Sequence, residues 1–263
     1  MLFDKIEDRL DDESQRKVAA FIADHADDIF EFPCALIRTP SVNPPGDEVA
    51  VSKVVMDRLA QLGIEDCSIA ACLPERPNVM AHVAGTSPGP TLMLSGHIDT
   101  KPAGNIDQWE TDPWVPVVVG DQLIGLGSGD MKASIAAMVY AAAALRHLGE
   151  FPGKLSLALT ADEENGSHFG SKWLAAEGYL EADVCVIGEP AGVHEEWESI
   201  HLVSRGAALF KVVVLGTQMH SSISDQLPAV NATLKMAELA LKMQRELRGY
   251  LTFDDHDYCR LGP

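Results

Sequence analysis

One histidine and a set of carboxylates follow apolar segments of this sequence, and these residue types suit the binding of divalent cations. They are His97, Asp99, Asp130, Glu163, Glu164 and Glu189. Imidazole nitrogen and carboxylate oxygen are ligands for Zn²⁺, Co²⁺ and Mn²⁺. Several carboxylates around one ion would leave excess negative charge, whereas two ions with a shared aspartate would balance it. Two ions about 3.5–4 Å apart polarise a carbonyl group and lower the pKa of a bridging water.

These residues are expected to meet because they follow successive elements of one sheet. Apolar runs at 91–96, 154–160 and 183–188 predict buried strands, and residues 132–149 predict a buried helix. Strands and helices alternate from about residue 78 to 190, which is typical of an α/β domain with a largely parallel central sheet flanked by helices. Ligands of open α/β sheets bind outside the carboxyl ends of the strands. We therefore expect the histidine and the carboxylates at one sheet edge.

Each motif alone also has a simpler explanation. His97 could be a core or loop residue with satisfied hydrogen bonds, and Asp130 could cap the helix that follows it. The acidic run 162–164 could be a solvated turn, and Gly-Glu-Pro at 188–190 could be a turn as well. The combination favours a site, because four consecutive strand–helix junctions each end in a candidate ligand.

The sequence predicts a change of organisation near residue 200. Residues 1–199 are assigned to the metal-binding domain, and residues 200–263 to part of a second, α+β domain. In the second part, a strand-rich stretch at 201–217 precedes a long amphipathic helix at 227–247. One or two strands with one helix cannot close a core comfortably, so this domain is expected to be incomplete.

Composition excludes several classes of partner. The chain has 20 Lys and Arg against 39 Asp and Glu, a net charge of −19, so neither a nucleic acid nor an anionic membrane is expected to bind. The five cysteines are scattered without C-x-x-C spacing, which fits a reducing compartment. No apolar leader or run of about 18 apolar residues is present, and we predict a soluble, cytoplasmic protein.

Five segments in this order resemble one known family. SGHIDTKPAG, GLGSGDMKAS, TADEENG, VIGEP and GTQMHSS resemble the acetylornithine deacetylase / succinyl-diaminopimelate desuccinylase family of co-catalytic zinc amidohydrolases, to which aminoacylases and carboxypeptidase G are related. The resemblance covers the chain from about residue 30 onward. It implies a zinc-peptidase-like catalytic domain, followed by the start of a lid and dimerisation domain.

The resemblance also implies a set of metal ligands. His97 and Glu189 match the ligands of one ion, Asp130 the bridging aspartate, and Glu164 a ligand of the second ion. Two divalent ions are therefore expected, with Zn²⁺ favoured over Co²⁺ or Mn²⁺. The family's last metal-ligating histidine lies in a later part of the chain that this sequence does not reach, so the protein is expected to be C-terminally truncated.

Further roles follow from the same resemblance. Glu163 matches the general base, and Asp99 matches the carboxylate that orients His97. His220 matches a lid histidine that reaches the active site of a neighbouring subunit and holds the substrate carbonyl oxygen. The family also implies a cis peptide bond between Asp130 and Met131.

The expected function is hydrolysis of the amide bond of an N-acyl amino acid by a two-metal enzyme, with the resemblance implying a homodimer through the second domain. Dipeptidase or carboxypeptidase activity on a dipeptide is one alternative. An inactive, truncated fragment that binds metal or forms dimers is another, because the last metal-ligating histidine is missing.

Overall fold

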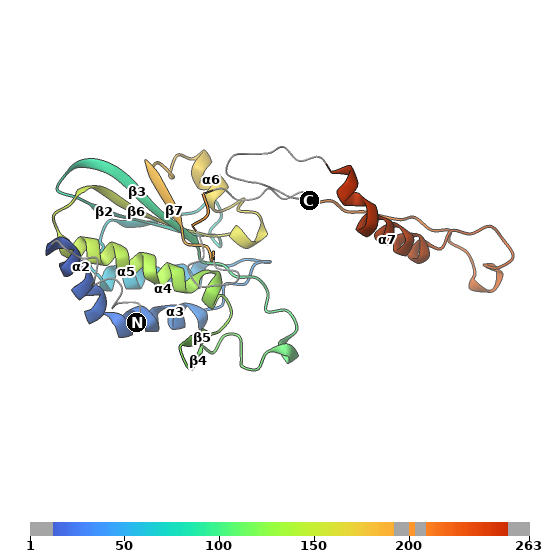
Figure 1. The fold of residues 1–263 in the computed structure, drawn as a ribbon, viewed down its shortest axis with the longest axis horizontal. Helices are drawn as coiled ribbons and strands as arrows, with labels where there is room; N and C mark the ends of the chain where they lie inside the picture. Colours follow the sequence, from blue (N-terminus) through green and yellow to red (C-terminus); the bar gives the residue numbers. More distant parts are fainter. Residues whose placement is uncertain (1–12, 192–199, 203–208, 252–263) are drawn as a thin grey trace. The chain divides into compact units, whose positions relative to one another are not determined.

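The computed structural model describes residues 13–191, 200–202 and 209–251 (Figure 1). The chain divides into two compact units, residues 1–190 and 191–263. This division lies slightly before the boundary predicted at residue 200, and residues 192–199 between the two positions are outside the described part.

Unit 1 contains a five-stranded mixed sheet in the order β1-β2-β6-β3-β7. The strands are β1 (Cys67–Ala70), β2 (Asn78–Ala84), β6 (Pro152–Thr160), β3 (Ser87–His97) and β7 (Val184–Ile187). β3 pairs in parallel with both β6 and β7, whereas β1–β2 and β2–β6 are antiparallel. A parallel pair needs a long crossover such as a helix, and α5 lies in the chain between β3 and β6. The predicted α/β class is confirmed, with the parallel pairs in the half of the sheet where β3 is central.

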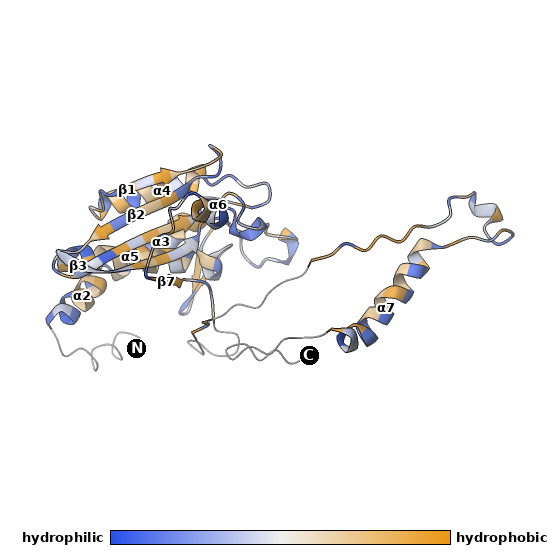
Figure 2. Ribbon diagram, turned by 90° about the horizontal axis from the view of Figure 1, so that it is seen from above, coloured by the Kyte–Doolittle hydropathy of each residue, from blue (hydrophilic) through white to orange (hydrophobic). Residues whose placement is uncertain are grey.

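Helices cover both faces of this sheet (Figures 1 and 2). They are α2 (Glu13–Asp24), α3 (Ala26–Ile37), α4 (Val49–Gln61), α5 (Ala133–Leu148) and α6 (Ser171–Ala176). A second, two-stranded sheet consists of β4 (Val117–Val119) and β5 (Gln122–Ile124). Three short helical turns are η1 (Ile106–Gln108), η2 (Ser128–Lys132) and η3 (Glu163–Asn165).

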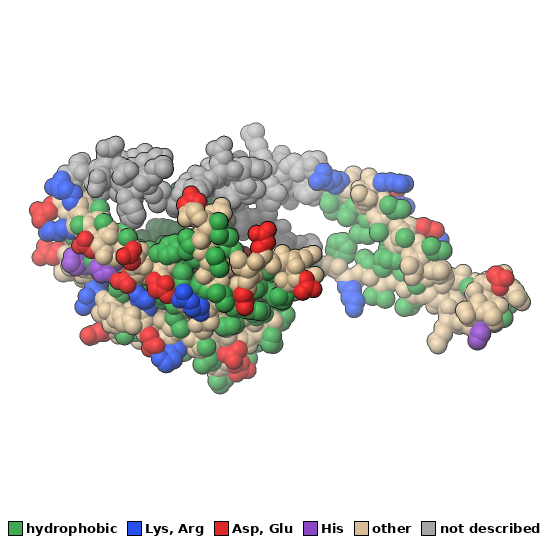
Figure 3. All heavy atoms as spheres, turned by 90° about the horizontal axis from the view of Figure 1, so that it is seen from below, with side chains coloured by type: hydrophobic (Ala, Val, Ile, Leu, Met, Phe, Trp, Pro, Cys, Tyr) green, Lys and Arg blue, Asp and Glu red, His purple; other side chains and the backbone are tan. Residues whose placement is uncertain are grey.

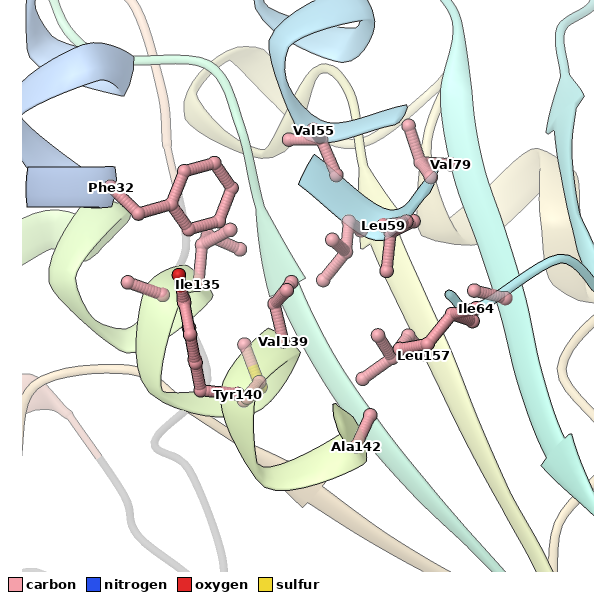
Figure 4. Close-up of a cluster of buried hydrophobic side chains, with 14 of the residues drawn as sticks. Phe32, Val55, Leu59, Ile64, Val79, Ile135, Val139, Tyr140, Ala142 and Leu157 are labelled. Atoms are coloured by element: carbon pink, nitrogen blue, oxygen red, sulfur yellow. The ribbon is translucent and has the colours of Figure 1, made fainter. Parts of the chain in front are cut away.

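The larger core lies between the sheet and helices α3, α4 and α5 (Figure 4). Phe32, Leu59 and Val139 come from the three helices and pack against strand residues such as Leu157. Alternate residues of β6 point to opposite faces, so Ala158 belongs instead to a small cluster with Leu174 of α6. Helix α5 is buried along much of its length because it lies between the sheet and the other helices.

Truncation of Leu157 tests the contribution of this core to stability. Leu157 is 1% exposed, so Leu157→Ala is expected to lower the free energy of unfolding by about 2–5 kcal/mol through lost burial and a residual cavity. Leu73→Ala is the matched control, because Leu73 is 36% exposed and should change stability by about 0.5 kcal/mol or less. Urea unfolding followed by circular dichroism measures both. Equal effects of the two substitutions would contradict this assignment of the core.

Unit 2 contains helix α7 (Ala232–Tyr250) and the turn η4 (Ser221–Ile223). Asn231 caps α7 through its side chain, which accepts a hydrogen bond from the backbone N–H of Leu234 at 3.1 Å. The predicted strand at 201–217 is not found in its described part, because residues 209–217 form no ladder. A strand requires a hydrogen-bonded neighbour, and the hydrogen bond from Thr217 N to Val230 O does not extend into one.

Side chains of both charges lie on the surface of unit 1. On the face shown in Figure 3, acidic side chains are interspersed with lysines and arginines. Among the described residues, no helix is both long and apolar enough to cross a bilayer.

Candidate metal centre

The carboxyl ends of the parallel strands bring the predicted site residues to one edge of the sheet. His97 is the last residue of β3 and pairs in register with Thr160, near the end of β6. The turn η3, with Glu163 and Glu164, follows β6 directly. Glu189 follows β7, where Gly188 N donates a hydrogen bond to Ser95 O of β3 at 3.0 Å. Parallel pairing therefore gives the three strands a common end.

Asp130 reaches the same edge from the turn η2, between β5 and α5. The peptide bond between Asp130 and Met131 is cis, as the family resemblance implies. Met131 is fully buried, and its sulfur accepts a hydrogen bond from His97 N at 3.2 Å. Buried Met131 therefore connects the end of β3, which carries His97, to the turn that carries Asp130.

The imidazole of His97 is buried, and contacts at both ring nitrogens fix its orientation. Its Nδ1 lies 3.0 Å from the backbone oxygen of Asp99 and 3.4 Å from Asp99 Oδ1. Its Nε2 lies 2.9 Å from Asp130 Oδ1, 3.4 Å from Glu189 Oε1 and 4.0 Å from Glu163 Oε2. A hydrogen bond at one ring nitrogen selects the tautomer, so Asp99 directs Nε2 toward the three carboxylates.

Asp99 also holds the turn that carries the neighbouring glutamates. Its two carboxylate oxygens accept hydrogen bonds from the backbone N–H groups of Glu163 and Glu164, each at 3.2 Å. Burial raises the pKa of Asp99, but hydrogen bonds from His97 and Asn43 outweigh burial and bring that pKa below its usual value. Asp99 is therefore a fixed negative charge beneath the site.

Within the described residues, two overlapping groups of side chains could hold a metal ion. One is His97 with Glu163 and Glu189, and the other is His97 with Asp130 and Glu164; within each group the ligand atoms lie within 4.8 Å of one another. Glu163, predicted as the general base, thus lies as close to His97 and Glu189 as a ligand would. Lys101 also reaches this region, because its Nζ lies 3.0 Å from Glu164 Oε2.

The close carboxylates shift the proton affinities of the cluster. Burial lowers the pKa of His97, but Asp99, Glu189 and Asp130 outweigh burial and raise that pKa to about 9. Burial raises the pKa of Glu189 to about 7, with Asp130 and Glu163 adding to the rise and His97 opposing it. Burial also raises the pKa of Glu163, supported by Glu164 and opposed by His97. Without a cation, the cluster therefore retains protons near neutral pH.

Sequence reasoning missed the buried polar residues behind the site. Asn43 donates through Nδ2 to Asp99 Oδ2 at 2.8 Å and to Asp162 Oδ1 at 3.0 Å. Arg76 pairs with both Glu48 and Asp162. The available signal was the density of charged and amide residues in predicted loops, but loops are usually solvated and the pattern alone does not indicate burial.

Lys132 is another buried residue that the sequence did not single out. It is 2% exposed, and its Nζ donates to Leu36 O at 2.7 Å and Thr39 O at 3.2 Å. These carbonyl groups lie at the C-terminal end of α3, where a helix attracts cations. Burial lowers the pKa of Lys132 to about 7. Lys132 thus fastens η2 to the end of α3.

His220 lies in unit 2, just before η4. Its Nδ1 accepts a hydrogen bond from Ser222 N at 3.2 Å and lies 2.8 Å from Ser222 Oγ. The side chain is exposed. The role in a neighbouring active site stays a prediction.

Comparison with known proteins identifies similar sequences. Residues 93–255 match the peptidase family M20/M25/M40. The chain is 36% identical over 198 residues to a succinyl-diaminopimelate desuccinylase from Leptothrix cholodnii, an alignment that covers 70% of this chain and 50% of the relative. It is 35% identical over 190 residues to the protein of the same name from Rhizorhabdus wittichii, with 70% and 48% covered. The chain thus spans about half the length of these relatives.

Solved structures are similar in fold. The M20 family metallo-carboxypeptidase Sso-CP2 from Sulfolobus solfataricus has a TM-score of 0.55 at 18% identity, covering 82% of this chain and 49% of that chain. A tripeptidase from Staphylococcus aureus has a TM-score of 0.53 at 20% identity, covering 82% and 56%. At these identities the likeness supports the fold alone.

Proposed function

Because the chain belongs to the peptidase family M20/M25/M40, we propose that its sheet-edge cluster is the metal centre of a hydrolase that cleaves the amide bond of an N-acyl amino acid. The observation that carries this proposal is the convergence of a buried, oriented imidazole with four carboxylates in two ligand-sized groups. The relatives named as desuccinylases favour an N-succinyl amino acid as the substrate class.

The chemistry of the donor set fits two divalent ions. His97 Nδ1 faces Asp99, so Nε2 is the free ligand atom, and one ring nitrogen can bind only one ion. A carboxylate can bind two ions through its two oxygens. Asp130 lies beside His97 and belongs to the group with Glu164, so we assign it the bridging role. His97 and Glu189 would then complete one ion's set and Glu164 part of the other's.

Different residues of this chain would have different roles in amide cleavage. The ions, when bound, supply a Lewis acid that polarises the amide carbonyl and acidifies water. Glu163 takes the proton of the attacking water and returns it to the leaving amine. Burial raises the pKa of Glu163 above that of an ordinary glutamate, which is the direction that favours a general base. Asp99 orients His97 throughout, and His220 of a neighbouring subunit would hold the carbonyl oxygen.

Three finer assignments belong to the same proposal. Zinc is the favoured metal, because a ligand set of one histidine with carboxylates suits it, with Co²⁺ and Mn²⁺ as alternatives. A homodimer through unit 2 would supply His220 to the partner's site. A cytoplasmic location agrees with the free thiols of Cys34, Cys67, Cys72 and Cys185.

Hydrolysis assays test this proposal. The protein is supplied with Zn²⁺ or Co²⁺ and offered N-succinyl amino acids, N-acetyl amino acids and dipeptides, and release of the free amine is followed. Metal-dependent turnover of an N-acyl amino acid is expected, and preferred cleavage of dipeptides would replace this assignment with a peptidase. Metal binding without turnover of any of the three would favour the inactive metal-binding fragment.

Metal binding is expected to depend on pH, because protons compete for the same atoms. His97 must lose its proton to bind metal, and its pKa is about 9 in the metal-free protein, while that of Glu189 is about 7. Apparent affinity for Zn²⁺ should therefore rise from pH 6 to about 9 and then level off, with protons released on binding. Titration calorimetry in buffers with different ionisation enthalpies measures that release. Affinity that is independent of pH would contradict the assigned ligands.

A further inference from the structure

A buried chain of polar contacts runs from Glu48, the residue before helix α4, to the predicted metal ligands, and Arg76 is the permanent cation in it. Arg76 lies between β1 and β2 and is 4% exposed, whereas Glu48 is fully buried and Asp162 is 1% exposed. A buried carboxylate needs a counterion or several hydrogen bonds. Two buried carboxylates thus depend on the same guanidinium.

The guanidinium of Arg76 contacts both carboxylates with defined geometry. Its Nε and Nη2 donate to the two oxygens of Glu48 at 2.7 and 2.9 Å. Nη2 also donates to Asp162 Oδ1 at 3.0 Å. The planar fork of an arginine allows this bidentate pairing, which a lysine ammonium group cannot reproduce. The ring of Phe169 lies 5.2 Å from the guanidinium carbon and limits its movement.

Asp162 connects Arg76 to the turn η3, which carries Glu163 and Glu164. It has a left-handed backbone conformation with φ of 63° immediately before Glu163. Its other carboxylate oxygen accepts a hydrogen bond from Phe169 N at 3.1 Å. Asn43 joins Asp162 to Asp99, which accepts the backbone N–H groups of Glu163 and Glu164. The turn is therefore held by Asp162, which precedes it, and by Asp99, which accepts its backbone N–H groups.

We propose that Arg76 is a positioning residue: by holding Asp162 against Glu48, it fixes the turn that aims Glu163 and Glu164 at the metal site. The effect on metal binding rests on the proposed function, whereas the positioning of the turn does not. Arg76→Lys keeps the positive charge and removes the fork, and Asp162→Asn weakens the same contact from the other end by removing the negative charge. Because the amide group of asparagine has only one acceptor oxygen, it cannot accept all the hydrogen bonds that Asp162 receives.

Two measurements on the full chain test the proposal. Amide hydrogen exchange reports the turn itself: in Arg76→Lys, the amides of Glu163 and Glu164 should exchange about tenfold faster or more, because their hydrogen bonds to a charged acceptor weaken. Calorimetric titration with Co²⁺ reports the site, and affinity should fall about 10- to 100-fold, as is typical when a residue behind the ligands is lost.

Arg58→Lys is the matched control. Arg58 also lies over an aromatic ring, that of Phe32 at 5.0 Å, and hydrogen-bonds the Tyr140 hydroxyl at 2.6 Å, within the helical layer. Its replacement should leave both measurements at wild-type values. An equal effect of Arg58→Lys would show general destabilisation and would overturn the proposal. If Arg76→Lys does not fold, the same two measurements on Asp162→Asn test the proposal.

The outcomes separate the two claims. Unchanged exchange in the turn of Arg76→Lys and Asp162→Asn overturns the positioning role, whatever the metal does. If the turn exchanges faster in the variants but the wild-type protein does not bind Co²⁺, the positioning role is supported and the proposed function is contradicted.

Discussion

Glu163→Gln protein is expected to bind metal about as tightly as the wild type and to lose about 10²- to 10⁴-fold in turnover. The reason is that glutamine keeps the size and hydrogen bonding of the side chain but cannot accept and return a proton, and general acid–base catalysis contributes about that much. Metal content and affinity by calorimetry, together with kcat on the best N-acyl amino acid, measure the two effects separately.

The neighbouring residue provides the control for this substitution. Glu164→Gln should reduce metal affinity first, because Glu164 is assigned as a ligand and lies in the group with His97 and Asp130. The structure also places Glu163 in a ligand-sized group with His97 and Glu189. Loss of metal in Glu163→Gln in proportion to its loss of turnover would therefore make Glu163 a ligand and remove it as the base.

His97→Ala is expected to have the largest effect on metal binding, with affinity for Zn²⁺ or Co²⁺ falling by more than about 100-fold. Both ligand groups in the described part of the chain share His97. Loss of a residue that only orients a ligand already costs about 10- to 100-fold, so loss of the ligand itself should cost more. Calorimetric titration measures the affinity, and circular dichroism verifies that the variant is folded.

His82→Ala is the control for the removal of a histidine from this sheet. His82 lies on β2, where its Nδ1 is 3.0 Å from Ser156 Oγ, and it contacts none of the proposed ligands. The variant should bind metal like the wild type. If His97→Ala also kept wild-type affinity, the metal would have to bind elsewhere.

The sequence predicted the strand ends well because their signal is local. The apolar runs at 91–96, 154–160 and 183–188 predicted β3, β6 and β7, and parallel pairing then required His97, Glu163 and Glu189 to lie near one another. The cis peptide at Asp130–Met131 was implied by the family resemblance, since neither residue type indicates it.

Other features depended on long-range contacts that no periodic pattern encodes. Residues 209–217 are rich in the β-branched and aromatic residues that favour strands, but a strand also requires a partner, which the pattern does not provide. Asn43, Arg76 and Asp162 are far apart in sequence and are polar residues of apparent loops. Only the fold shows that these side chains are buried together and satisfy one another.

Anomalous diffraction from crystals grown with Zn²⁺, recorded at the zinc absorption edge, tests the central claim most directly. The account predicts two peaks about 3.5–4 Å apart, one within about 2.1 Å of His97 Nε2 and beside Glu189, the other beside Glu164, with Asp130 between them. Absence of any peak within bonding distance of His97 Nε2, in crystals that hold zinc elsewhere, would contradict it.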